Sequence, residues 1–90
     1  MYLHIGNGVV AAEKDILGLF DLDNLTSSEE GAAFLRAAEK EGILENIGGD
    51  FDLPKSVIVT SGGGKTRAFL SPVTTLTLLK RNRETGDDIF

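Results

Sequence analysis

The chain has 90 residues, 41% of them hydrophobic, a length that supports one small domain and excludes a two-domain enzyme. The absence of cysteine excludes disulfides, cysteine-based metal sites and thiol nucleophiles, and a single histidine favours binding or assembly over catalysis, so we expect no enzyme activity, cofactor or metal. The net charge of −5 counts against nucleic acid as a partner unless the bases are concentrated, and without a ~20-residue apolar span or a signal peptide pattern we expect a cytoplasmic protein with no membrane contact.

A β-hairpin is predicted at the start of the chain. Two short apolar segments, 2–5 and 9–12, flank an Asn-Gly pair at 7–8, and this pair favours a tight turn with positive φ at both positions. The apolar run at 16–20 predicts a third strand. We interpret residues 21–24 as the loop that ends it.

A first helix is predicted at about residues 27–41. Its start fits a capping box, formed by either Thr26 with Glu29 or Ser27 with Glu30. A glycine directly after the segment supplies the stop signal.

The second half of the chain begins with strands. Residues 43–47 indicate a short edge strand, and the β-branched run at 56–60 is the clearest strand signal in the chain. The glycine-rich segment 61–65 is predicted as a turn, and residues 66–70 as the strand that returns from it.

A second helix is predicted at about residues 72–81. Ser71 is a good N-cap residue, and Pro72 is favoured at the first helical position. We expect the polar segment 82–90 to be a flexible tail.

Charge is divided unevenly along the chain. Residues 1–52 hold three bases and eleven acids, whereas residues 53–83 hold six bases and no acid. Two interpretations stay open. Either the oppositely charged halves attract each other, within a monomer or between subunits, or the basic segment forms a local surface for an anionic partner.

Three motifs resemble chemical sites but lack required members. Gly64-Lys65-Thr66 resembles the end of a phosphate-binding loop, yet Val59 stands where the first glycine belongs and a strand follows where a helix should begin, so we expect no nucleotide binding. The acidic segment 21–24 opens like a calcium loop without the later ligands. His4 has no second histidine with which to form a metal or catalytic pair, so it is expected at a surface or interface.

Four sequence blocks occur in order along residues 1–81: Tyr2–Gly6, Lys14–Asp21, Pro54–Thr60 and Leu70–Arg81. Together they resemble the bacterial extracellular-matrix regulator family RemA/RemB, most closely its RemB branch. The resemblance implies a small DNA-binding transcription regulator of biofilm-matrix genes. It also implies ring-like homo-oligomers whose subunits are similar to a LytTR-type DNA-binding module.

The candidate DNA-binding residues follow from the resemblance and from the basic segment. Lys14 and Lys55 lie at motif positions where the family is commonly basic. The RemA branch has an arginine pair before the strand that matches 57–59, whereas this chain reads Gly-Asp-Phe-Asp-Leu at 49–53. The predicted phosphate contacts are Lys14, Lys55, Lys65, Arg67, Lys80 and Arg81.

The sequence therefore predicts one α+β domain over residues 1–81, with a small antiparallel sheet of about five strands in hairpins and two helices. The first functional hypothesis is a ring-like homo-oligomeric regulator that binds double-stranded DNA through phosphate contacts without reading bases. The alternative is an oligomeric protein-interaction scaffold that binds no DNA. The acidic net charge and the missing arginine pair favour this alternative.

Overall fold

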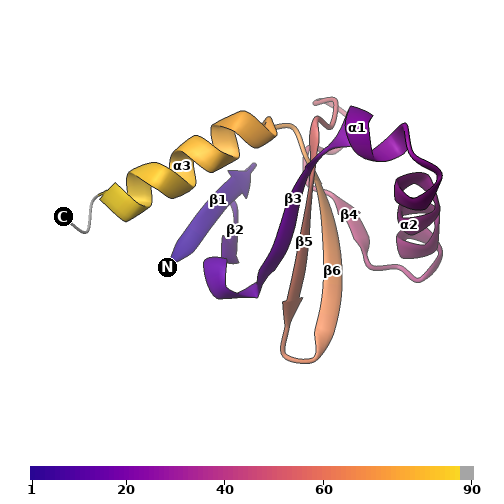
Figure 1. Cartoon of the computed structure of the whole chain (residues 1–90), viewed down its shortest axis with the longest axis horizontal. Coiled ribbons are helices and arrows are strands. Elements are labelled where there is room, and N and C mark those ends of the chain that lie inside the picture. The colour runs from indigo at the N-terminus through magenta and orange to yellow at the C-terminus, as the bar shows by residue number, and fades with distance from the viewer. Residues whose placement is uncertain (88–90) are drawn as a thin grey trace.

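The computed structural model describes the backbone of residues 1–87 and the side chains of residues 1–81. Within this part of the chain the strands are β1 (Tyr2–Gly6), β2 (Val9–Ala12), β3 (Ile16–Asp21), β4 (Leu44–Asn46), β5 (Ser56–Gly62) and β6 (Lys65–Ser71). The helices are α1 (Leu22–Thr26), α2 (Glu29–Lys40) and α3 (Thr75–Asp87), with a 3-10 helix, η1 (Glu13–Asp15), before β3. The α+β class is confirmed (Figure 1).

The strands form two sheets instead of the one predicted. β1 and β2 make a two-stranded sheet, and the other strands make a four-stranded sheet in the order β3-β5-β6-β4. β4 lies at the edge, as predicted, but it runs parallel to β6, so the prediction of a purely antiparallel sheet is wrong. A parallel partner needs a long connection, and the chain between β4 and β6 contains the whole of β5.

Both predicted hairpins are present, and each turns through two residues. Asn7 and Gly8 have φ values of 50° and 79°, and Gly63 and Gly64 have φ values of 60° and 78°. Positive φ at both central positions matches the twist of antiparallel strands, which explains the glycines. The second turn is shorter than the predicted 61–65 because β5 and β6 stay paired as far as Gly62 and Lys65.

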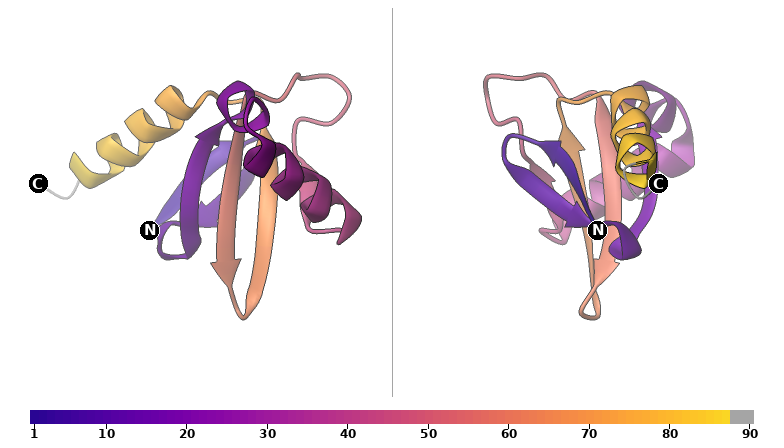
Figure 2. Two further views of the ribbon diagram at one scale, coloured as in Figure 1. Left: turned by 45° about the vertical axis from the view of Figure 1, so that its right-hand side comes forward. Right: turned by 90° about the vertical axis from the view of Figure 1, so that its left-hand side faces the viewer.

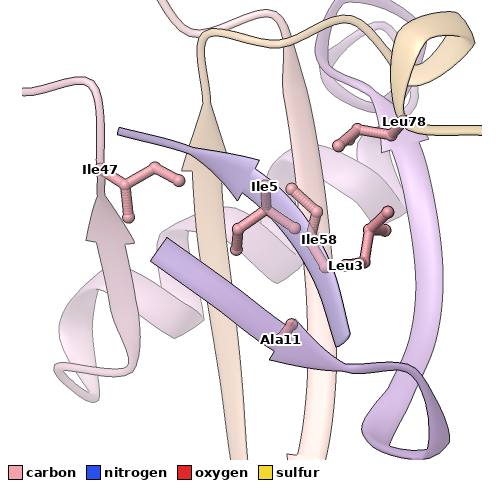
Figure 3. Close-up of a cluster of buried hydrophobic side chains, with 6 residues drawn as sticks. All are labelled: Leu3, Ile5, Ala11, Ile47, Ile58 and Leu78. Atoms are coloured by element: carbon pink, nitrogen blue, oxygen red, sulfur yellow. The ribbon is translucent and has the colours of Figure 1, made fainter. Parts of the chain in front are cut away.

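The four-stranded sheet separates two hydrophobic cores. On one face β1, β2 and α3 cover a core that includes Ile5, Ile58 and Leu78 (Figure 3). On the other face α1 and α2 cover a second core around Val57 and Ala38. Successive β5 residues thus point into different cores, and the strand is buried from Ser56 to Thr60. This explains its unbroken apolar run.

A short helix stands where a loop was predicted at 21–24. The Asp21 side chain accepts a hydrogen bond from the Asn24 backbone N–H at 3.1 Å and so caps α1. The N-cap of α2 is Ser28, whose Oγ accepts from the Gly31 N–H at 3.0 Å. Neither predicted capping box is used, because the preceding residues belong to α1 and its C-cap.

The second predicted helix begins later than expected. Ser71 ends β6 as a fully buried residue, so it does not cap a helix. Thr74 is the N-cap of α3 instead, because its Oγ1 accepts a hydrogen bond from the Thr77 N–H at 3.2 Å. The first helical residue is therefore Thr75.

α3 also ends later than predicted. Its backbone continues through residues 82–87, which were assigned to the flexible tail, and residues 88–90 lie outside the described part of the chain. No helix among the described residues is long and apolar enough to cross a membrane.

Candidate nucleic-acid interface

Two of the predicted DNA-binding residues share one face of the four-stranded sheet near the turn of the β5–β6 hairpin. Lys65 and Arg67 are two positions apart on β6, so their side chains leave the strand on the same side. Both are exposed, and with Asp15 they line an open hollow of about 260 Å³ beside β2. The hairpin turn lies at one end of the molecule, beyond the other strands (Figure 2).

Lys14 belongs to the same end of the molecule. Lys14 lies in η1, and its neighbour Asp15 packs closely against Gly62. A Cβ atom added to Gly62 would be 2.7 Å from Oδ2 of the Asp15 carboxylate. Gly62 is the last residue of β5, so the packing brings η1 to the base of the hairpin turn. We call Lys14, Lys65 and Arg67 the hairpin-end cluster.

Acidic groups lie beside this cluster. Arg67 Nη1 is 3.9 Å from Glu45 Oε1 on β4, and both side chains are more than half exposed. Water screens such a pair strongly, so a phosphate group is able to compete with Glu45 for the guanidinium. Asp15 also lines the hollow, which keeps the excess of positive charge at this end small.

Lys55 lies at the opposite end of β5. Its carbonyl accepts a hydrogen bond from the Leu22 N–H at 3.0 Å, and its own N–H donates to the Ser71 carbonyl at 2.7 Å. These bonds fix its backbone next to the start of α1, while its side chain is exposed. At about 3.3 Å per residue, β5 separates Lys55 from the hairpin turn by roughly 25 Å.

The remaining two candidates lie on α3. Lys80 is exposed, and Arg81 Nη1 donates a hydrogen bond to the His4 carbonyl of β1 at 3.0 Å. His4 itself is exposed on the face of β1 that carries Tyr2, as expected for a surface histidine. The six predicted residues therefore occupy three separate regions, and only the hairpin-end cluster brings several of them together.

Sequence reasoning missed an exposed apolar loop. Phe51, between the acidic residues Asp50 and Asp52, is 96% exposed, and Leu53, which follows Asp52, is 82% exposed. This loop holds the positions at which the RemA branch is expected to carry an arginine pair. The available signal was the alternation of large apolar residues with aspartates in a glycine-containing loop, because such residues gain nothing there unless a partner covers them.

The motifs that resemble chemical sites have ordinary structural roles. Lys65 begins a strand, whereas a phosphate-binding loop requires a helix at that point. Asp21 caps α1. Among the described residues, no group of three or more His, Asp or Glu side chains is placed to hold a metal ion.

The fold and the cluster define a small α+β domain with exposed bases at the end of a β-hairpin. No protein-family model matches the chain. Extracellular matrix regulatory protein B of Bacillus subtilis (strain 168) is 33% identical to it over 82 residues, which cover 90% of this chain and 89% of that protein. The chain belongs to the extracellular matrix regulator family RemA/RemB.

Proposed function

We propose that this protein is a regulator of extracellular-matrix genes that binds double-stranded DNA as a homo-oligomer. The regulatory part of the proposal is supported by the relative, which is named as an extracellular matrix regulatory protein. The DNA-binding part is supported by the hairpin-end cluster, in which Lys65 and Arg67 line one exposed hollow and Lys14 directly precedes Asp15, which lines the same hollow.

The cluster is suited to phosphate contacts rather than to reading bases. Lysine and arginine on a sheet face reach the backbone of a duplex, whereas α2 exposes several acids, among them Glu29, Glu30 and Glu39, and is unsuited to enter a groove. Two or three phosphate contacts per subunit give weak binding. Several subunits on one duplex raise the total affinity because each later contact forms at high effective concentration.

A titration of fluorescent duplex DNA at two salt concentrations tests the proposal. We expect binding at low salt, with log K falling against log salt by roughly 0.9 for each phosphate neutralised. Lys65→Glu should weaken binding to unrelated sequences alike and flatten the slope, because phosphate contacts carry no sequence information.

The matched control is Lys40→Glu. Lys40 is an exposed lysine at the end of α2, and α2 covers the face of the sheet opposite the hollow. Lys40→Glu changes the net charge by the same amount as Lys65→Glu. Lys55→Glu then tests whether the opposite end of β5 contributes. If the wild-type protein fails to bind duplex DNA at low salt, or if Lys65→Glu and Lys40→Glu behave alike, the DNA-binding proposal is wrong.

The exposed loop favours a second candidate function, a protein-interaction scaffold that binds no DNA. Phe51 and Leu53 offer an apolar contact flanked by negative charge. Such a surface repels phosphate and fits a protein partner with an apolar pocket and a basic rim. Absence of DNA binding in the titration would place this candidate first.

A further inference from the structure

An apolar groove lies on the helical side of the molecule, away from the hairpin-end cluster. Leu17 and Phe20 of β3, Leu25 of α1 and Phe34 of α2 line it, and its volume is about 360 Å³. Leu17 is 67% exposed although it lies in a strand. It sits where the β3–β5 register shifts between Ile16 and Gly18, which leaves it outside both cores.

A second unpartnered apolar surface lies on α3. Leu76 is 78% exposed and Leu79 is 54% exposed, whereas Leu78 is buried in the core with β1. Residues three and four apart share one side of a helix, so Leu76, Leu79 and Lys80 form one outward stripe. The helix itself extends away from the sheets (Figure 1).

The α3 stripe and the groove are complementary in charge, and both are apolar at their centre. Glu30 lines the apolar groove, and the two helices that contribute to it also carry Glu29, Asp21 and Asp23 in or next to their first turns, so the charge near the groove is acidic. The α3 stripe combines two leucines with a base, and amphipathic helices commonly bind apolar grooves in this way. Another exposed apolar segment, the Phe51 loop, carries aspartates that the groove acids would repel.

The stripe is unable to reach the groove of its own chain. α3 packs on the face of the four-stranded sheet that carries β1 and β2, whereas α1 and α2 cover the other face (Figure 1). The groove belongs to that other face, because residues of α1 and α2 line it. The sheet separates the two surfaces. An α3 stripe that fills this groove therefore belongs to a second copy of the chain.

We propose that α3 of one subunit docks through Leu76 and Leu79 into the Leu17–Phe34 groove of the next subunit. The inference rests on the proposed homo-oligomer and specifies its interface. The two surfaces differ, so the contact is head-to-tail and each subunit uses one surface on either side. Repetition closes into a ring when the rotation permits.

Two variants, each with one surface disabled, test this interface. Leu76→Glu alters the helix stripe and keeps the groove, whereas Leu17→Glu alters the groove and keeps the stripe. Both positions are mostly exposed, so we expect both variants to fold, as circular dichroism will check. In light scattering on the eluting peak, wild type should show several times 9.6 kDa and each variant 9.6 kDa.

Mixing the two variants gives the decisive result. A Leu76→Glu chain still offers its groove to the intact helix of a Leu17→Glu chain, so the mixture should form a dimer of two 9.6 kDa chains and stop there. The control is Leu53→Glu, which alters an 82% exposed leucine outside both surfaces and should keep the wild-type mass.

The outcomes separate this interface from the proposed function. If wild type is oligomeric and either variant keeps that mass, or if the mixture stays monomeric, the α3-to-groove contact is wrong while the oligomer stands. Dissociation by Leu53→Glu alone would assign the contact to the Phe51 loop instead. A monomeric wild type would overturn the oligomer itself, and the DNA titration tests the remaining part of the proposed function independently.

Discussion

Ser71 decides where the last helix begins. In the sequence it looks like an N-cap in front of a proline, but in the structure its hydroxyl donates a hydrogen bond to the Ile5 carbonyl of β1 and accepts one from the Val73 N–H. Opposite it on β5, Ser56 donates to the Val73 carbonyl at 2.7 Å. Ser71 thus joins the connection between β6 and α3 to the first hairpin, and Ser56 joins the same connection to β5.

Replacing Ser71 with alanine should destabilise the domain. The substitution leaves the buried Ile5 carbonyl without a donor, and an unsatisfied buried group reduces the free energy of unfolding by about 1–3 kcal/mol. Urea unfolding measures the difference. Ser61→Ala serves as the control, since Ser61 is exposed and should change the midpoint little. Equal midpoints for the two variants would contradict the role assigned to Ser71.

At the scale of elements, Gly31 sets how closely α1 and α2 approach. It lies in the first turn of α2 and is buried, and an added Cβ would collide with the Leu25 carbonyl and its side chain. A glycine in a helix is unfavourable by up to about 1 kcal/mol relative to alanine. The close packing of the two helices explains why glycine is nevertheless present here.

We therefore expect Gly31→Ala to lower stability even though alanine favours helices. Forcing the methyl group into this contact requires the α1 backbone to shift, and overpacking of this kind reduces the free energy of unfolding by about 1–3 kcal/mol. Ala33→Gly, at an exposed position of the same helix, measures the propensity effect alone. If a thermal melt shows Gly31→Ala to be more stable than wild type, the prediction is wrong, and the α1 backbone shifts to accept the methyl group without loss of stability.

Elements with local signals were predictable, and elements that depend on distant partners were not. The Asn7-Gly8 turn, β5 and α2 follow from turn chemistry, β-branching and an alanine-rich amphipathic segment. The parallel register of β4 with β6 joins residues 24 positions apart, as in Leu44 with Ala68, and no local pattern encodes it. The cap at Asp21 was visible but was interpreted as part of a loop.

The same division applies to the candidate site. Strand alternation alone places Lys65 and Arg67 on one side of β6. Their neighbourhood with Lys14 arises only when β3 pairs with β5 and η1 packs on Gly62. The distance of Lys55 from them follows from the length over which β5 pairs with β6. The apolar groove was missed because Leu17 and Phe34 meet only after the helices cover the sheet.

At the scale of the whole molecule, β5 contributes residues to both hydrophobic cores. Ile58 contributes to the core under the first hairpin and Val57 to the core under α2, and both are fully buried. Loss of either core therefore exposes the strand on which the other core depends. This arrangement couples the two faces of the sheet into one folding unit.

We expect the two faces to unfold in one transition. Tyr2, the single tyrosine, lies on β1 and reports on the hairpin face by fluorescence, while far-ultraviolet circular dichroism reports mainly on the helices. Denaturation curves from the two signals should coincide, as they do in a two-state reaction. A fluorescence transition at clearly lower denaturant would show that the hairpin detaches while the helical face stays folded.

The strand order β3-β5-β6-β4 also has a consequence for the newly made chain as it leaves the ribosome. β3 emerges early, yet its partner is β5, and Asp21 pairs with Ser56 only after 35 further residues have been added. β4 likewise waits for β6. Until then Leu17 and Phe20 lie on a strand without a partner. Unpaired strands with exposed apolar residues are sites of misassembly, both in nascent chains and in partly folded intermediates. The glycine turn that lets β5 and β6 pair at once shortens that exposure, because it delivers partners for both waiting strands together.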